Sequence, residues 1–232
     1  MAQPPTATDT FLREVDENLR RDRLTGFAKR YGSWVIAGVV LFLALSGGYI
    51  YWQQRQVQKS EQQVERLSTI YKGIGNGDLK GSAAQLDQVA KESKGSVKAS
   101  ALFTRAALAL EQNDVKLATA TFRDVASDDN LPKPYRDLAL IRQTSLEFDS
   151  LTPDQVITRL EPLAKPGNPW FGSAGELTGA ALLKQGKKQE AARLFATLAR
   201  DRNVPETLRD RAVQIASSLG VDESSILLAP AQ

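Results

Sequence analysis

Apolar residues along this chain form one long uninterrupted run, followed by shorter helical patterns. No charged residue occurs between Tyr31 and Gln54, and the run at residues 34–52 is mostly apolar. At about 1.5 Å per helical residue, such a segment crosses about 30 Å of hydrocarbon. Aromatic rings, which prefer the headgroup boundary, stand at both ends: Tyr31, Trp34, Tyr49, Tyr51 and Trp52. The pattern predicts a transmembrane helix over residues 31–52 that contacts the lipid bilayer.

A cleaved signal peptide is the alternative interpretation of this run. Ala44 and Ser46 have the spacing of a cleavage site. However, a charged segment of some 30 residues precedes the run, and apolar residues continue to Trp52, which is atypical of a signal peptide. A retained anchor is therefore the favoured interpretation.

The basic residues beside the run predict its orientation. Residues 16–30 carry five Lys or Arg side chains, whereas residues 53–67 carry three. The positive-inside rule then places the N-terminus in the cytoplasm and the bulk of the chain outside. In a bacterium with two membranes this describes a single-pass inner-membrane protein with a periplasmic C-terminal domain, and the absence of cysteine is compatible with that oxidising compartment.

The segments that flank the span have patterns of their own. Residues 1–30 are predicted as a cytoplasmic tail with a short amphipathic helix, because apolar residues recur at three- and four-residue steps from Phe11 to Leu19. This helix either docks on a membrane or partner, or has no role beyond topology. Residues 53–76 are predicted as a helical stalk, since good helix formers continue without Pro until the glycines at 73–77.

The rest of the chain is predicted to be all-α. Apolar residues recur at helical spacing throughout residues 79–219, and no alternating run rich in Val, Ile and Thr predicts a strand. We expect a helical domain over residues 77–220 and a flexible C-terminal tail over residues 221–232. The expected helices cover residues 79–93, 96–111, 114–127, 133–148, 153–164, 170–184, 188–201 and 205–219.

An internal repeat connects these helices. Pro132, Pro169 and Pro205 are 37 and then 36 residues apart, near the 34-residue tetratricopeptide period. Residues 110–126 align with residues 183–199 at an offset of 73, with matching Leu, Gln, Ala, Phe and Ala. In this register Ala118 and Ala191 permit close helix approach, while Phe122 and Phe195 fill the space beside them. The pattern predicts an α-solenoid of about three tetratricopeptide-like helix pairs. The alternative is an unrelated helical bundle whose Ala-rich segments align by chance.

The composition argues against catalysis and against nucleic-acid binding. The chain contains no histidine and no cysteine, which removes the commonest general base, the thiolate nucleophile and most transition-metal ligands. The glycine cluster at residues 73–77 follows no strand, so it does not indicate a phosphate-binding loop. The net charge is only +3, without a concentrated basic block. We expect no enzyme activity, no cofactor, no metal and no nucleic-acid partner.

Peptide binding by the first helix of each pair is the expected activity. First helices line the inner surface of such arrays, and here they cover about residues 96–111, 133–148 and 170–184. Apolar residues at helical spacing usually pack inward, so for two of the candidate side chains, Phe103 and Leu110, a core position is the favoured interpretation and a groove role the alternative. The candidate groove residues are Phe103, Leu110, Arg136, Arg142, Glu176 and Lys184.

The whole layout resembles a known family. A short cytoplasmic segment, one span ending in Tyr49-Ile-Tyr-Trp-Gln-Gln54, a polar stalk and a degenerate repeat domain are similar to the ancillary SecYEG translocon subunits of bacterial inner membranes. The sharpest stretch is Trp170 to Ala191, and residues 11–24 resemble the alphaproteobacterial branch.

That resemblance implies an adaptor beside the SecYEG translocon. Such a protein associates with a membrane-anchored periplasmic chaperone of the prolyl-isomerase type and helps pass emerging chains to periplasmic folding factors. The alternative that the residues leave open is an anchored scaffold for a different envelope-assembly or cell-division complex.

Overall fold

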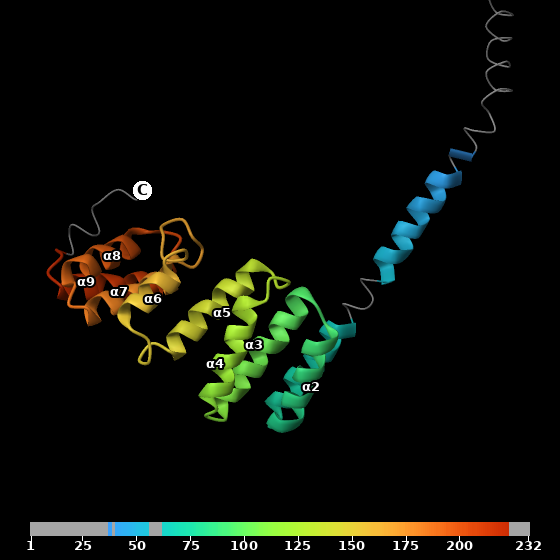
Figure 1. Cartoon of the computed structure of the whole chain (residues 1–232), viewed down its shortest axis with the longest axis horizontal. Helices are drawn as coiled ribbons and strands as arrows, with labels where there is room; N and C mark the ends of the chain where they lie inside the picture. Colours follow the sequence, from blue (N-terminus) through green and yellow to red (C-terminus); the bar gives the residue numbers. More distant parts are fainter. Residues whose placement is uncertain (1–36, 39, 56–61, 223–232) are drawn as a thin grey trace, which may run out of the picture. The chain divides into compact units, whose positions relative to one another are not determined.

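The computed structural model describes residues 37–38, 40–55 and 62–222 (Figure 1). The predicted amphipathic helix within residues 1–30 and most of the predicted C-terminal tail lie outside the described residues. The chain divides into two compact units, residues 1–61 and residues 62–232, and each is described by itself.

The described part of the first unit is helical. Residues 40–55 form a continuous helix, and its large apolar side chains from Val40 to Trp52 are exposed. The Arg55 guanidinium lies 5.2 Å from the centroid of the Tyr51 ring. Among the helices of the described residues, none combines the length and the apolar character needed to cross a membrane. Tyr31 and Trp34, at the start of the predicted span, lie outside this part of the chain.

The second unit is built from helices, and residues 62–222 contain no strand, as the sequence predicts. Each helix expected between residues 79 and 219 is present. The sixth ends at Leu160 rather than residue 164, because Pro162 has no N–H with which to continue it. The helices are residues 62–75, α2 (Leu79–Glu92), α3 (Gly95–Glu111), α4 (Val115–Ser127), α5 (Lys133–Leu146), α6 (Pro153–Leu160), α7 (Phe171–Lys184), α8 (Lys188–Arg200) and α9 (Glu206–Ser218).

One turn geometry recurs between paired helices. A residue with positive φ follows the first helix in three places, at Gly77 (87°), Asn113 (58°) and Gly186 (75°). In each case the next residue donates its backbone N–H to a carbonyl five residues earlier, at 2.8–3.0 Å. This closure ends one helix and aims the chain back along it. The three turns lie 36 and then 73 residues apart, so they mark the repeat.

The turn at Gly77 identifies a helix pair that the sequence analysis missed. Residues 62–75 were assigned to the stalk, but Leu67 and Ile70 are buried in one core cluster with Leu86 of α2 and Leu108 of α3. Buried Ser82 and Leu86 follow Gly77 at the same distances at which Ala118 and Phe122 follow Asn113. Residues 62–75 and α2 therefore form an additional pair ahead of the three expected ones.

Small residues and one aromatic ring hold the last pair together. Ala118, Phe122, Ala191 and Phe195 are all buried, as the repeat predicts. The space for the Phe195 ring comes from Gly179 on the facing first helix, where an added Cβ would lie 2.6 Å from two ring carbons. The close approach therefore depends on small residues in both helices of the pair.

The middle pair departs from this pattern. Its turn spans residues 147–152 and has no positive-φ residue, and α6 begins with a capping box on Thr152. Val156 and Leu160 of α6 are buried in a cluster with Ile141 of α5 and Ala174 of α7. Figure 1 shows α5 beside α4, whereas α6 lies mainly against α7.

Candidate binding surface

The first helices of successive pairs contact one another. α3 contacts α5, α5 contacts α7, and α7 contacts α9. Polar side chains join neighbours along this row: Tyr71 Oη lies 3.4 Å from Thr104 Oγ1, and Arg211 of α9 bonds Glu176 of α7. We call the exposed side of residues 62–75, α3, α5, α7 and α9 the first-helix face. It is the surface on which the sequence analysis placed the candidate groove residues.

Phe103 belongs mainly to the core. Its ring packs edge-on against Phe122 at a centroid distance of 5.3 Å and against Tyr135 at 6.1 Å. These contacts join α3 to α4 and to α5, and edge-to-face geometry is favourable for aromatic pairs. The structure therefore favours the core explanation for this half-buried residue.

Leu110 and Arg142 are the two candidates available to a partner. Leu110 is 36% exposed near the end of α3. Arg142 on α5 is exposed. They offer one apolar and one cationic contact on neighbouring first helices.

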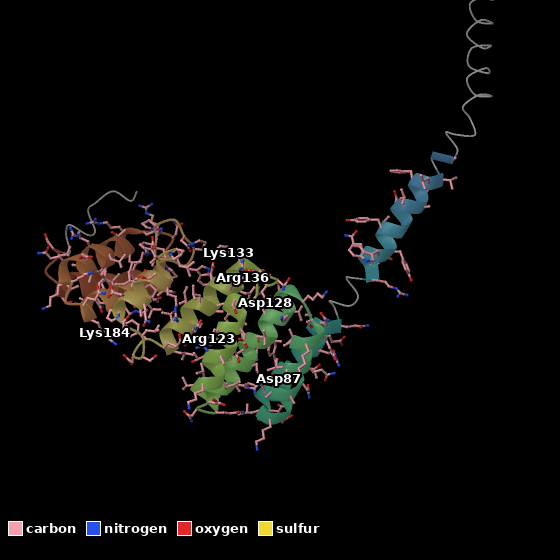
Figure 2. All side chains as sticks on the ribbon, in the orientation of Figure 1. Asp87, Arg123, Asp128, Lys133, Arg136 and Lys184 are labelled. Atoms are coloured by element: carbon pink, nitrogen blue, oxygen red, sulfur yellow. The ribbon has the colours of Figure 1, made fainter. Side chains whose placement is uncertain are left out.

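Arg136 has a structural role. Its guanidinium bonds the Asp129 carboxylate in the loop that connects α4 and α5, and its Nε is buried without a partner among the described residues. Figure 2 shows Arg136 beside Lys133 and Asp128 at this end of the helices. It therefore fixes the loop rather than facing a ligand.

Glu176 and Lys184 are both held by ion pairs, the first to Arg211 of α9 and the second to Asp149 in the turn between α5 and α6. Both Glu176 carboxylate oxygens accept from Arg211 at 2.9 Å, and these hydrogen bonds raise the pKa of Arg211 above its usual value. Lys184 (Figure 2) donates to Asp149 Oδ1 at 2.7 Å, and its Nζ lies 4.4 Å from the centroid of the Phe148 ring. Both pairs are substantially exposed, so a partner can reach them.

A carboxylate joins the middle pair to its neighbours. Glu147, with a side chain only 16% exposed, accepts from Arg159 of α6 at 2.6 Å and from Arg123 of α4 at 2.7 Å. Burial alone would raise the pKa of Glu147, but the hydrogen bonds and charges of the two arginines outweigh it and hold that pKa below its usual value. This network joins the C-terminal end of α5 to both α4 and α6.

Tyr71 and Arg211 also lie on this face, although the sequence pattern did not identify them. Tyr71 was placed in the stalk, and its 45% exposure becomes meaningful only once residues 62–75 are recognised as a first helix. Arg211 lies on α9, which follows the last expected pair. Within the described residues, no group of three or more acidic side chains is arranged to hold a metal ion.

Comparisons with known proteins agree with the repeat. The family model for the tetratricopeptide repeat-like domain matches residues 26–215. No curated protein and no solved structure matches the chain. Because the match covers most of the 232 residues and the turns recur at the repeat spacing, the chain belongs to the tetratricopeptide repeat-like domain family.

Proposed function

We propose that this chain is a membrane-anchored interaction scaffold at the SecYEG translocon. Its family supports the role of an interaction scaffold, since stacked helix pairs of this kind present extended surfaces to protein partners. The observation that carries the binding role is the first-helix face, where Leu110 and Arg142 are exposed on neighbouring helices. The chain has neither histidine nor cysteine, the residues that most often serve as general base and thiol nucleophile.

The anchor is proposed from the sequence. Residues 31–52 are uncharged and bounded by aromatic residues, and the matched region, which begins at residue 26, includes them. The basic residues before residue 31 favour a cytoplasmic N-terminus and a periplasmic domain. The translocon and the prolyl-isomerase-type chaperone enter through the resemblance of the layout and of residues 170–191.

Site-specific photocrosslinking in native membranes tests the binding role. A photoreactive amino acid at Leu110 or Arg142 of the full chain should capture a protein partner. The same amino acid at Lys188, exposed on the second helix α8, is the matched control. Equal capture from all three positions, or none from the first-helix face, would show that this face is not the binding surface.

Mass spectrometry of the captured material tests the partner. Recovery of translocon subunits and a membrane-tethered chaperone supports the secretion adaptor. If division or envelope-assembly proteins are recovered instead, the translocon proposal is wrong and the alternative scaffold function replaces it. Alkaline extraction of the membranes tests the anchor separately, because a spanning protein stays in the pellet whereas a peripheral one is released.

A further inference from the structure

The last helix, α9, ends in the turn that joins the paired helices of this array. Gly220 has a φ of 93°, and the N–H of Val221 bonds the carbonyl of Ala216, five residues earlier, at 3.1 Å. Gly220 follows Gly186, the corresponding turn residue between α7 and α8, by 34 residues. The second helices α2, α4 and α8 end differently, at C-cap residues with extended backbone. α9 therefore ends as a first helix, and its turn aims the chain back along it.

One position of each first helix shows whether a second helix covers it. Seven residues before the turn residue, this position holds Ile70, Ala106 and Gly179, which are all buried. Ile70 and Ala106 share core clusters with residues of α2 and α4. An added Cβ at Gly179 would meet the Phe195 ring of α8. The corresponding residue of α9 is Val213, which is partly buried, and within the described residues no second helix follows α9 to cover this face.

The segment after this turn has the length and composition of a short second helix. Asp222 and Glu223 begin it, and acidic residues are favourable in the first turn of a helix. Pro230, which cannot continue a helix, limits it to residues 222–229. The length of this segment equals that of α6, the 8-residue second helix of the middle pair. Three consecutive apolar side chains within it are available for packing: Ile226, Leu227 and Leu228.

The register of this segment agrees with that of the other second helices. The residue five positions after the turn residue is small and buried in three of them: Ser82, Ala118 and Ala191. Ser225 takes this position after Gly220. The next position is at least partly buried in α2, α4 and α8, whereas the one after it is exposed in α2 and α8. In the same register Ile226 would face α9 and Leu227 would face solvent.

We propose that residues 222–229 form a short second helix that packs on Val213 of α9 and completes a helix pair beyond α7 and α8. The segment is joined to the turn itself, so its effective concentration at α9 exceeds that of any separate chain. The array then ends in a polar surface, because Glu206, Asp210 and Gln214 share another stripe of α9 and are exposed. A terminal repeat needs such a polar outer face for solubility.

Hydrogen exchange of the full chain in an uncharged maltoside detergent, followed by mass spectrometry, tests this packing. Amides of residues 226–229 should exchange about tenfold more slowly than in Ile226→Ser, because burial of one isoleucine side chain is worth at least that factor. Leu227→Ser, on the opposite side of the segment, is the matched control and should keep the protection. Ile226→Ser lies outside α2 to α9, so unchanged exchange in α7 and α8 shows that the fold is intact.

A second pair of variants tests the other side of the contact. Val213→Ser should also remove the protection of residues 226–229, whereas Gln214→Ser, at an exposed position of α9, should not. The two substitutions are adjacent in the chain but lie on different sides of the helix.

Three other outcomes would overturn the proposal. If residues 226–229 of the full chain exchange at the rate of an unstructured peptide, the segment does not pack. If Ile226→Ser and Leu227→Ser exchange alike, or if Val213→Ser has no effect, the segment does not pack on this face. Protection that falls on dilution would mean that a second copy covers α9 instead. None of these results depends on the translocon or on the binding role of the first-helix face.

Discussion

The contact between Gly179 and Phe195 gives a direct test of how the last helix pair is packed. A Cβ added at Gly179 would lie 2.6 Å from both Cε2 and Cζ of the Phe195 ring, and that ring is only 2% exposed. Gly179→Ala must therefore displace a rigid, enclosed group. Phe195→Ala removes the obstacle and leaves the space empty.

The expected free energies have opposite signs in the two backgrounds. Overpacking a core costs about 1–3 kcal/mol, and a rigid ring at this distance favours the upper part of that range. Replacing a helical Gly by Ala gains about 1 kcal/mol. In the wild-type background Gly179→Ala should thus destabilise by about 1–2 kcal/mol. Phe195→Ala alone should cost about 3–5 kcal/mol, and in that background Gly179→Ala should stabilise by about 1 kcal/mol.

Urea unfolding of the full chain, followed by far-ultraviolet circular dichroism in uncharged detergent, measures all four proteins of the cycle. The comparison is valid where the denaturant slope stays constant across the four, which indicates that the same surface unfolds in each. Gly75→Ala is the control, because a Cβ there meets no atom within 4 Å and its effect should be the same in both backgrounds.

The coupling free energy between Gly179→Ala and Phe195→Ala tests whether the two residues are in packing contact. Its expected size is about 2–3 kcal/mol, well above the few tenths seen for independent sites. If Gly179→Ala has the same effect in both backgrounds to within about 0.5 kcal/mol, the two residues are not in packing contact. The account of close helix approach in this pair would then be wrong.

Three further substitutions test the charge network, the turns and a helix cap. Glu147→Gln should destabilise by about 2 kcal/mol near neutral pH. Because the pKa of Glu147 is lowered in the fold, this contribution to stability is present above the unfolded-state pKa and is lost as the pH falls through the folded-state pKa. The melting curves of variant and wild type should therefore converge in acid. A constant difference in melting temperature at every pH would contradict this role. At the positive-φ turns, Gly186→Ala should destabilise the fold by about 1–2 kcal/mol, whereas Asn113→Gly should be neutral or stabilising by a few tenths of a kcal/mol. Equal losses of stability in chemical denaturation would show that backbone strain at these turns does not determine the effect. Thr152→Ala should cost about 1 kcal/mol in the same assay by removing the capping box of α6, and an unchanged midpoint would mean that the box adds nothing.

The helices from residue 79 onward were predictable because each carries its own signal. Apolar spacing, Pro at the start of α5 and α9 and Gly or Asn in the turns are local features. The register of Ala118 with Ala191 and of Phe122 with Phe195 was predictable for the same reason. All four positions combine a distinctive residue type with burial in the fold.

The first helix pair escaped prediction because its side chains differ from the others. Ser82 and Leu86 occupy the positions of Ala118 and Phe122, so residue identity gives no match. What the pairs share is the positive-φ turn and the buried position of the side chains that follow it. Gly77 was visible in the sequence, but it was interpreted as the end of a stalk rather than as a turn between paired helices.

The candidate surface was predictable by helix but not by residue. The candidates do lie on first helices, yet several of their partners come from sequence-distant residues, such as Tyr135 for Phe103 and Arg211 for Glu176. A single helix pattern does not contain that information. Only the folded arrangement shows that Leu110 and Arg142 are exposed to a partner, whereas the other candidate side chains already contact residues of the same chain.

Occupied ion pairs on the first-helix face are compatible with partner binding. The pair between Glu176 and Arg211 leaves side chains 34% and 54% exposed, and the pair between Lys184 and Asp149 is more exposed still. Solvent screens such pairs, so they add little to folding stability and are readily exchanged. An acidic partner segment can therefore take Arg211 or Lys184 from its present carboxylate without unfolding the pair of helices. Glu147 differs, because its two arginines hold separate helices together and its side chain is largely buried, so exchange there would disrupt the fold itself.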